Sequence, residues 1–517
     1  MGFMDQLRNE MSNEKQLTEN GAVGFRTTGK ELLDLNFSVA SLRRATDDEI
    51  VKRFTNAYFE DKVVAVKWLF YARDAREGLG ERRLFRVVME EFANQEPKAV
   101  KELLKLVPKY GRWDDLWCLL ETDLVDDVIA VVKAQLSEDF DNMSNGKSIS
   151  LCAKWMPSAN ASSEQTKKYA KIFCKKFGDT PRNYRKTLSK MREYIDVVER
   201  KMSAKEWVDI NYEAVPSRAN LIYNGAFLRN DEDRRRAYLG ALEKGEAKIN
   251  ASVLFPHDIV HKYGYAGRTD AALEGMWKAL PDTVKGCGNT IVVADGSGSM
   301  TDRVDYNSGV TALDVANSLA IYFAERSSGE FKDKYITFSE RPQFVDFSNA
   351  KNLRDKLDIA RQHNEVANTN IEAVFDLILS TAVNNHMRQE DIPANILIVS
   401  DMEFDSCATS GAPATRSSYG WYMSSRVRPT EALFETIEKK YRAVGYKLPR
   451  LVFWNVNSRT GTIPVKNNDL GVALVSGFSV NIVKMVMSNK TDPYECLLET
   501  LNSERYQAVE DAVKDIL

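Results

Sequence analysis

Apolar side chains follow two different rhythms along this chain, and the change between them lies near residue 285. Between residues 40 and 280 they recur every three or four positions, as in 61–75 and 81–92, which is the spacing of one face of an α-helix. Alternating, strand-like patterns are nearly absent from this part. A succession of amphipathic helices joined by short turns predicts an all-α, HEAT-like helical repeat domain that forms a solenoid or a ring.

Beyond residue 285 the apolar residues gather in short continuous runs separated by helical segments. The runs 291–294 and 396–399 are typical of parallel strands that are covered on both faces. This pattern predicts a Rossmann-like α/β domain with a mostly parallel sheet. We expect strands near residues 290–295, 335–339, 343–347, 395–400, 451–457 and 471–475, and C-terminal helices at 479–488 and 493–516.

The two rhythms divide the chain into a flexible N-terminal tail (1–24), a helical domain (25–284) and an α/β domain (285–517), and 517 residues are enough for two domains. The formal net charge is only −3, and no segment approaches the ~18 to 20 consecutive apolar residues that cross a bilayer. The N-terminus lacks the apolar core of a signal peptide. Six scattered cysteines are typical of reduced thiols, so we expect a cytoplasmic protein with no membrane partner.

Charge is distributed unevenly within the helical part. Residues 151–192 carry 11 Lys or Arg side chains and two Asp or Glu side chains. Basic side chains concentrated in one stretch are expected of a surface that binds phosphates. The same composition also describes a solvated helix face, so it leaves both interpretations open.

The residues after the first expected strand carry the most specific chemical signal. Asp295, Ser297 and Ser299 are separated by single glycines and directly follow the apolar run 291–294. The carboxyl ends of central strands are where α/β sheets bind ligands. A carboxylate with two hydroxyls offers hard oxygen donors, which suit Mg²⁺ or another hard divalent cation better than zinc. Taken alone, the motif is also compatible with an ordinary Gly/Ser turn.

This Asp-x-Ser-x-Ser pattern resembles the metal-ion-dependent adhesion site of von Willebrand factor A domains. In that family a threonine from a middle loop and an aspartate after a later strand complete the site, and the matching residues here are Thr369 and Asp401. Relatives often have Thr-Asp in the middle loop, whereas Asn370 follows Thr369 in this chain. The resemblance implies an Mg²⁺ ion, a protein partner that offers an acidic side chain to it, and a ligand set of Asp295, Ser297, Ser299, Thr369 and Asp401.

Signs of catalysis are weak. The chain has four histidines, no HExxH motif, and no Ser or Cys with an evident His partner. Asp401, Glu403 and Asp405 form an acidic run of the kind that two-metal hydrolysis uses. Because alternating side chains after a strand end scatter to both sides, we favour one metal ligand flanked by solvated acids. We therefore expect no enzymatic activity.

Six short motifs extend the resemblance over about residues 25–515. They are Arg73–Arg82 (RDAREGLGER), Ala153–Pro157 (AKWMP), Tyr184–Lys186 (YRK), Val215–Ser217 (VPS), Ser400–Asp405 (SDMEFD) and Val452–Asn455 (VFWN). Taken together, the helical segments and the A-domain pattern resemble the Ro autoantigen family, in which a TROVE module of helical repeats closes into a ring with a C-terminal von Willebrand A domain. The six motifs resemble the hallmarks of a sister group of plant and phage proteins of unknown function, to which the resemblance is closer.

The Ro family implies binding of small non-coding or misfolded RNA. Basic side chains would neutralise phosphates, and exposed bases would stack on aromatic rings or guanidinium planes. We expect Trp155 and Tyr184, however, to belong to the core. The residues that we expect to contact RNA are Arg73, Arg76, Arg82, Lys154, Arg185, Lys186 and Arg218.

Two classes of function remain open. The first is a non-enzymatic RNA-binding scaffold whose A domain captures a protein through Mg²⁺. The second is a phage or host protein-interaction or assembly module in which RNA plays no part. A Ser-, Ala- and Gly-rich insert at residues 406–428 follows the metal-side loop, either as a lid that orders on a partner or as a plain disordered loop.

Overall fold

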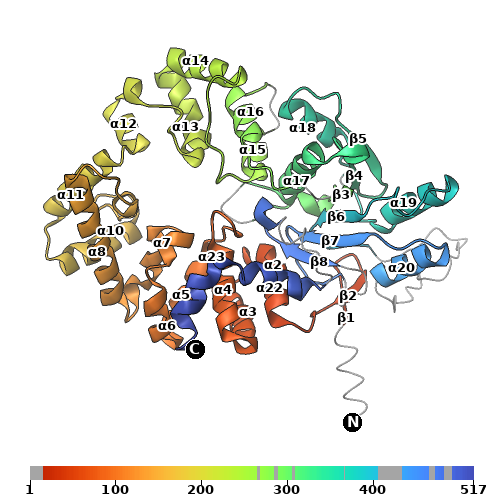
Figure 1. Cartoon of the computed structure of the whole chain (residues 1–517), viewed down its shortest axis with the longest axis horizontal. Helices are drawn as coiled ribbons and strands as arrows, with labels where there is room; N and C mark the ends of the chain where they lie inside the picture. Colours follow the sequence, from red (N-terminus) through yellow and green to blue (C-terminus); the bar gives the residue numbers. More distant parts are fainter. Residues whose placement is uncertain are drawn as a thin grey trace, which may run out of the picture. The chain divides into compact units, whose positions relative to one another are not determined.

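The computed structural model describes residues 15–264, 268–284, 289–304, 309–365, 367–405, 433–464, 472–482 and 492–517. Within these residues no helix is long and apolar enough to cross a membrane. The chain folds into two compact units, whose elements are labelled in Figure 1. The sheet unit comprises the residues up to Ala45, Phe255–Thr269 and Asp282–Thr500. The helical unit comprises Thr46–Leu254, Asp270–Pro281 and Leu501–Leu517.

A six-stranded sheet in the order β5-β4-β3-β6-β7-β8 forms the centre of the sheet unit. All neighbouring strands pair in parallel except β5, which lies antiparallel to β4 at one edge. Because β3 lies between β4 and β6, the carboxyl ends of these three strands meet at the middle of one edge. The strands are β3 (Thr290–Asp295), β4 (Lys334–Phe338), β5 (Gln343–Asp346), β6 (Asn395–Ser400), β7 (Arg450–Asn455) and β8 (Ala473–Ser476).

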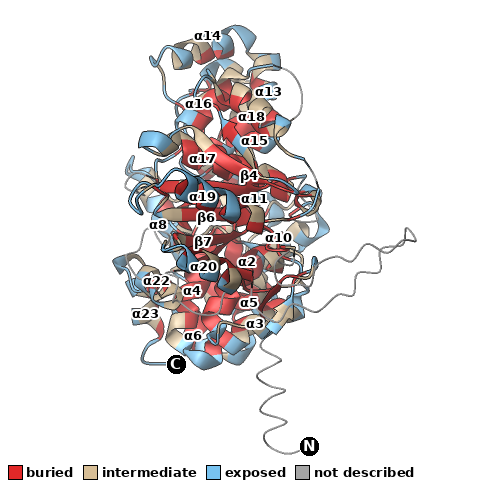
Figure 2. Ribbon diagram, turned by 90° about the vertical axis from the view of Figure 1, so that its right-hand side faces the viewer, coloured by how far each residue is buried: buried red, intermediate tan, exposed pale blue. Residues whose placement is uncertain are grey.

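Helices cover the sheet, so that β6 and β7 are buried along nearly their whole length (Figure 2). Helix α17 packs on β3, β4 and β6, and α2 packs on β7 and β8. An N-terminal hairpin of β1 (Lys15–Leu17) and β2 (Val23–Phe25) precedes α2. The helices of this unit are α2 (Glu31–Leu42), α15 (Pro256–Tyr263), α17 (Ala312–Arg326), α18 (Leu353–Gln362), α19 (Glu372–Asn384), α20 (Leu433–Ala443) and α22 (Pro493–Leu501), with 3₁₀ turns η3 (Gly298–Thr301), η4 (Gly329–Phe331) and η7 (Val480–Ile482).

The helical unit is a succession of short helices in which neighbours along the chain pack on one another. Thr46, Asp61, Ser163 and Thr180 each cap the helix that follows by accepting a backbone hydrogen bond. Its helices are α3 (Asp47–Glu60), α4 (Lys62–Arg73), α5 (Arg83–Gln95), α6 (Pro97–Leu103), α7 (Val107–Tyr110), α8 (Val125–Ser144), α9 (Cys152–Trp155), α10 (Glu164–Phe177), α11 (Pro181–Tyr194), α12 (Val198–Ala204), α13 (Ser217–Asn230), α14 (Glu232–Glu243), α16 (Ala271–Lys278) and α23 (Glu504–Val513), with 3₁₀ segments η1 (Trp113–Glu121) and η2 (Trp207–Asp209).

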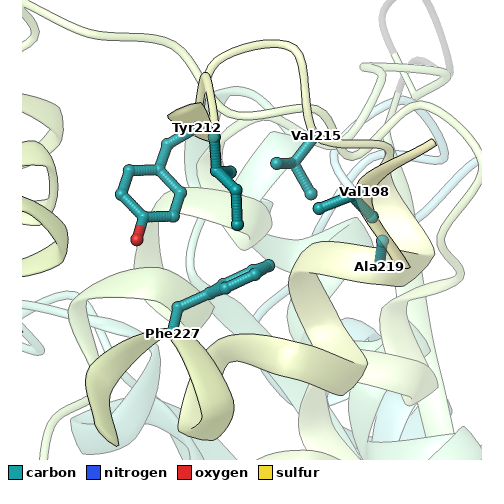
Figure 3. Close-up of a cluster of buried hydrophobic side chains, with 6 residues drawn as sticks. Val198, Tyr212, Val215, Ala219 and Phe227 are labelled. Atoms are coloured by element: carbon teal, nitrogen blue, oxygen red, sulfur yellow. The ribbon is translucent and has the colours of Figure 1, made fainter. Parts of the chain in front are cut away.

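The Val215–Ser217 motif has a structural role, because Val215 packs in the core of the helical unit. Figure 3 shows the buried side chains packed there, which are Val198, Ile210, Tyr212, Val215, Ala219 and Phe227. The guanidinium of Arg235, which is fully buried, lies 4.8 Å from the centre of the Tyr212 ring and 5.1 Å from that of Phe227. Its Nε and Nη2 donate to Asn224 Oδ1. Aromatic faces and an amide therefore hold this cation.

The expected fold class is confirmed: a helical part is followed by a mostly parallel α/β sheet. Each of the six expected strands is present, with ends within two residues of the prediction. The helix expected at 479–488 falls largely outside the described residues, and the insert at 406–428 lies outside them.

The structure assigns both ends of the chain differently from the expected domains. The expected flexible tail over 1–24 includes β1 and β2, which pack within the sheet unit. The helix expected at 493–516 is two helices, and the second of them, α23, belongs to the helical unit. Apolar periodicity identifies a helix but does not identify the surface on which its apolar face packs, which is why these assignments could not be made from the sequence.

Candidate metal centre and basic cleft

The loop after β3 holds three of the expected metal donors close together. The Ser297 N–H donates to Asp295 Oδ1 at 2.9 Å, and the hydroxyls of Ser297 and Ser299 are 3.2 Å apart. Gly296 donates its N–H to the end of β4, and a Cβ at this position would lie 3.0 Å from Thr337 Oγ1. Glycine permits this close approach. The loop is therefore fixed against the neighbouring strand.

The loop after β6 brings a second carboxylate to the same place. The Ser299 side chain acts to lower the pKa of Asp401, against the effect of burial, and Ser400 Oγ donates to Asp295 Oδ2 at 2.6 Å. The middle loop is attached to the first loop, because Gly298 N–H donates to the carbonyl of Ala367, two residues before Thr369. Among the expected donors, Asp295, Ser297, Thr369 and Asp401 are each at most 1% exposed.

Burial of both carboxylates gives the centre its electrostatic character. Burial raises the pKa of Asp295, and burial together with the negative charge of Asp295 raises the pKa of Asp401. In the described part of the chain no three His, Cys, Asp or Glu side chains form a metal-binding group, so an ion here would need the Ser and Thr hydroxyls as well. Two mutually repelling carboxylates with hydroxyls beside them are a donor set that fits a hard divalent cation.

The other two acids of the run are not solvated, contrary to the expectation. Glu403 is 0% exposed, and its carboxylate accepts hydrogen bonds from the backbone N–H groups of Arg459, Thr460 and Glu19 at 2.8 to 2.9 Å. Asp405 is partly buried. The side chains do scatter after the strand end, but each one points into a neighbouring loop and connects that loop to the metal side of the sheet.

Asp405 is hydrogen-bonded to the middle loop at Thr369. Its Oδ2 accepts the N–H of Thr369 at 3.1 Å, and its own N–H donates to the Thr369 carbonyl at 2.9 Å. Asn370 instead accepts a hydrogen bond from the N–H of Ala373 and caps the start of α19. A carboxylate thus lies beside Thr369 even though the sequence has Asn in the position next to it.

Arg73, one of the expected RNA contacts, is a structural residue. It is 3% exposed, and its Nε and Nη2 donate to Asp115 Oδ2 at 2.7 and 2.6 Å. The other carboxylate oxygen of Asp115 accepts from Arg86, which also contacts Asp114. A guanidinium that is enclosed and paired in this way has no surface to offer a phosphate, so the structure removes Arg73 from the expected set.

Lys154 and Arg185 lie together in the lining of one cleft in the helical unit. The cleft has a volume of about 800 Å³ and is lined by five cationic and two acidic side chains. Its cations are Arg86, Lys154, Arg185, Arg192 and Arg200, its acids are Asp114 and Glu199, and its aromatic residues are Trp117, Trp155, Tyr169 and Tyr184. Within the described residues no carboxylate pairs with Lys154 or Arg185.

Trp155 is part of the cleft surface and not of the core. It is only partly buried, and the guanidinium of Arg112 lies 3.9 Å from the centre of its ring. Arg82, another of the expected RNA contacts, is exposed and lies outside the lining of the cleft. Tyr184, in contrast, is a core residue as expected, because it is 2% exposed and donates its hydroxyl hydrogen to the Pro157 carbonyl.

The remaining expected RNA contacts, Arg76, Lys186 and Arg218, are exposed and lie outside the lining of the cleft. Part of the basic stretch at 151–192 is neutralised, since Lys168 pairs with Glu121 and Lys176 pairs with Asp126. Composition could not distinguish paired from unpaired cations, because the acids come from other helices.

Two family models match this chain, both described as domains of unknown function: DUF2828 over residues 161–289 and DUF7788 over residues 289–515. The chain is 29% identical over 524 residues to the uncharacterized protein L728 of Acanthamoeba polyphaga mimivirus, covering 94% of this chain and 86% of that protein. Among solved structures it is similar to the RO (RSR) protein of Deinococcus radiodurans, with 14% identity and a TM-score of 0.45, covering 91% of this chain and 94% of the other.

Replacing Arg73 should destabilise the helical unit far more than replacing the exposed Arg76. Arg73→Leu leaves Asp115 buried with one partner fewer, which should cost about 3 kcal/mol of unfolding free energy. Arg76→Ala should cost less than about 1 kcal/mol. Six of the eight tryptophans lie in the helical unit, so urea unfolding followed by tryptophan fluorescence reports mainly on it. Equal unfolding midpoints for the two variants would contradict the structural role of Arg73.

Proposed function

We propose that this protein is a non-enzymatic scaffold that binds single-stranded RNA in the cleft of its helical unit. We further propose that its sheet unit holds Mg²⁺ at the carboxyl edge of the sheet. The observation that carries the metal proposal is the juxtaposition of Asp295 and Asp401, two buried carboxylates, with the hydroxyls of Ser297 and Ser299. Asp295, Ser297, Ser299, Thr369 and Asp401 would hold the ion.

The ion would relieve an electrostatic cost at the carboxyl edge of the sheet. A carboxylate buried beside another carboxylate is disfavoured in its charged form, as the raised pKa values of Asp295 and Asp401 indicate. A divalent cation neutralises both charges and attracts the hydroxyl oxygens. Its remaining coordination position would accept the acidic side chain of a protein partner, which is how the sheet unit would take part in an assembly.

Two features of the cleft and its surroundings support RNA as the ligand of the helical unit. Lys154 and Arg185 offer cations that carry no carboxylate partner among the described residues. The Arg112 guanidinium, which is paired with Asp114, lies on the Trp155 indole, and a base can stack on this flat platform. Unpaired bases stack on such platforms, whereas paired bases in A-form duplexes are not accessible. The RNA would therefore be a single-stranded end or loop of a small non-coding or misfolded RNA.

The alternative is a protein-interaction or assembly module in which RNA plays no part. One observation favours it: several cleft cations are already satisfied within the protein. Arg192 donates to the carbonyls of Ala153 and Met156, and Arg200 pairs with Glu193 and Glu206. The RNA measurement below separates the two functions.

Removing Asp295 should abolish metal binding and the stabilisation that the ion provides. We expect Mg²⁺ at 100 times its dissociation constant to stabilise the wild-type protein by about 2.7 kcal/mol. Asp295→Ala should bind no Mg²⁺ in titration calorimetry and should show no rise in thermal midpoint. Asp391→Ala, which removes an exposed carboxylate of the same unit that is paired with Arg388, is the matched control and should behave as the wild type. Unchanged Mg²⁺ affinity in Asp295→Ala would contradict the proposal that the ion binds at this position.

Removing the two unpaired cations of the cleft should weaken RNA binding. Fluorescence anisotropy of a labelled oligouridylate, measured across a salt series, gives the affinity and its salt dependence. For the double variant Lys154→Ala/Arg185→Ala we expect an affinity loss of about tenfold or more and a salt slope that is smaller by about 1.4, since each phosphate contact to single strands contributes about 0.7.

The control for this measurement is Lys168→Ala/Lys176→Ala, because both lysines are already paired with acids. Equal losses in the two double variants would indicate general electrostatic attraction rather than a cleft. If the wild-type protein does not bind the oligonucleotide at low salt, the result would favour the alternative function, a protein-interaction or assembly module.

A further inference from the structure

Residues Lys15–Phe25, here called the strap, cross the loops that carry the metal donors. Thr18 Oγ1 donates to the Phe404 carbonyl at 2.6 Å, and the Glu19 N–H donates to Glu403 Oε2 at 2.8 Å. Gly21 forms an antiparallel bridge with Asp405. The strap is therefore hydrogen-bonded along the loop that begins at Asp401.

The far end of the strap is attached to the loop after β7. Phe25 and Ile463 exchange two backbone hydrogen bonds, each of 2.8 Å. Gly24 lies so close to this loop that an added Cβ would be 2.4 Å from Thr462 Cγ2 and 2.7 Å from the Ile463 carbonyl oxygen. A side chain at position 24 would push the strap away, so glycine is required for the contact.

Asn20 connects the strap to a metal donor itself. Its Nδ2 donates to Thr369 Oγ1 at 3.2 Å and to the Glu403 carbonyl at 2.6 Å. The amide thus lies against the donor oxygen of Thr369 and also fixes it relative to the loop after β6. On the side of Asp401, the Arg459 guanidinium lies 3.5 Å from Oδ2 and is held at 2.8 Å by the carboxylate of Glu19 on the strap.

From these contacts we propose that the strap is an intramolecular cover of the metal centre, which must leave before the carboxylate of a partner can reach the ion. This inference rests on the proposed metal site. An ion that binds a partner's acid needs one open side, yet Thr369 and Asp401 are at most 1% exposed in the described conformation. Asn20 covers the Thr369 side, and Arg459, held by Glu19, covers the Asp401 side.

The strap also positions the donors that it covers. Asn20 orients the Thr369 hydroxyl, so removing the Asn20 side chain should weaken metal binding and also open the site. Gly24→Ala, in contrast, leaves every donor and Asn20 unchanged and acts only by lifting the strap from the loop after β7. Because lifting the strap also moves Asn20 away from Thr369 and Glu19 away from Arg459, Gly24→Ala should expose the ion and weaken metal binding as well, while leaving every donor side chain in place.

The test uses Mn²⁺ as the probe in the full-length protein. Hydrogen exchange of the strap amides reports whether the strap is closed, and paramagnetic relaxation of water protons reports whether bound Mn²⁺ contacts exchanging water. Leu17→Ala is the matched control, because this strap side chain is 45% exposed. In the wild type we expect slow exchange at Glu19, Ala22 and Phe25 and weak water relaxation.

In Gly24→Ala and Asn20→Ala the strap amides should exchange about fivefold faster for each hydrogen bond lost, and water relaxation by bound Mn²⁺ should rise. Both variants should also weaken Mn²⁺ affinity, because each one takes the Asn20 amide away from Thr369. Equal water relaxation in the wild type and Gly24→Ala, with Mn²⁺ bound in an Asp295-dependent manner, would overturn the cover and leave the metal centre intact. Absence of Mn²⁺ binding from the wild type and both strap variants would overturn the metal centre and the cover together.

Discussion

The burial of Asp295 and Asp401 side by side is the constraint on which the carboxyl edge of the sheet depends. Neither carboxylate has a full cationic partner in the described residues; Arg459 approaches Asp401 only to 3.5 Å. Hydroxyls and backbone N–H groups instead fix their orientation, as Ser400 does for Asp295. Such an arrangement stores unfavourable electrostatic energy that a divalent cation would release. The loops after β3 and β6 meet at this pair, and the strap is hydrogen-bonded to the same loop after β6 through Glu403 and Phe404.

How much of this could be predicted from the sequence depends on the range of the interactions. Strands and the Asp-x-Ser-x-Ser loop are local patterns, and the expected strand ends are accurate to two residues. The strap was missed because its contacts join Asn20 to Thr369 and Glu403, which are more than 340 residues away. Its one local signal is the apolar Val23-Gly24-Phe25, whose glycine matters only because Thr462 lies against it.

Some residues of the motifs in the helical unit are buried structural residues and others lie at the surface, and residue type does not reveal which. In the Arg73–Arg82 motif, Arg73 is buried against Asp115, and Asp74 is buried with hydrogen bonds from Arg505 and Tyr506 of α23. Lys154 and Trp155 of the Ala153–Pro157 motif instead line the cleft. A cation at the end of a helix is structural when a buried acid pairs with it, and it can contact a ligand when no such acid is present. Only the tertiary structure shows which of the two applies.

The central claim is that a hard divalent cation occupies the space between the ends of β3 and β6. The most direct measurement is a crystal structure of the full-length protein grown with Mn²⁺, with data collected for anomalous scattering. The account predicts one anomalous peak bonded to oxygens of Asp295 and Asp401 and near the hydroxyls of Ser297, Ser299 and Thr369, at the ~2.0–2.2 Å expected for a small hard cation. A map with no peak there at saturating Mn²⁺, and with both carboxylates in well-defined density, would contradict it.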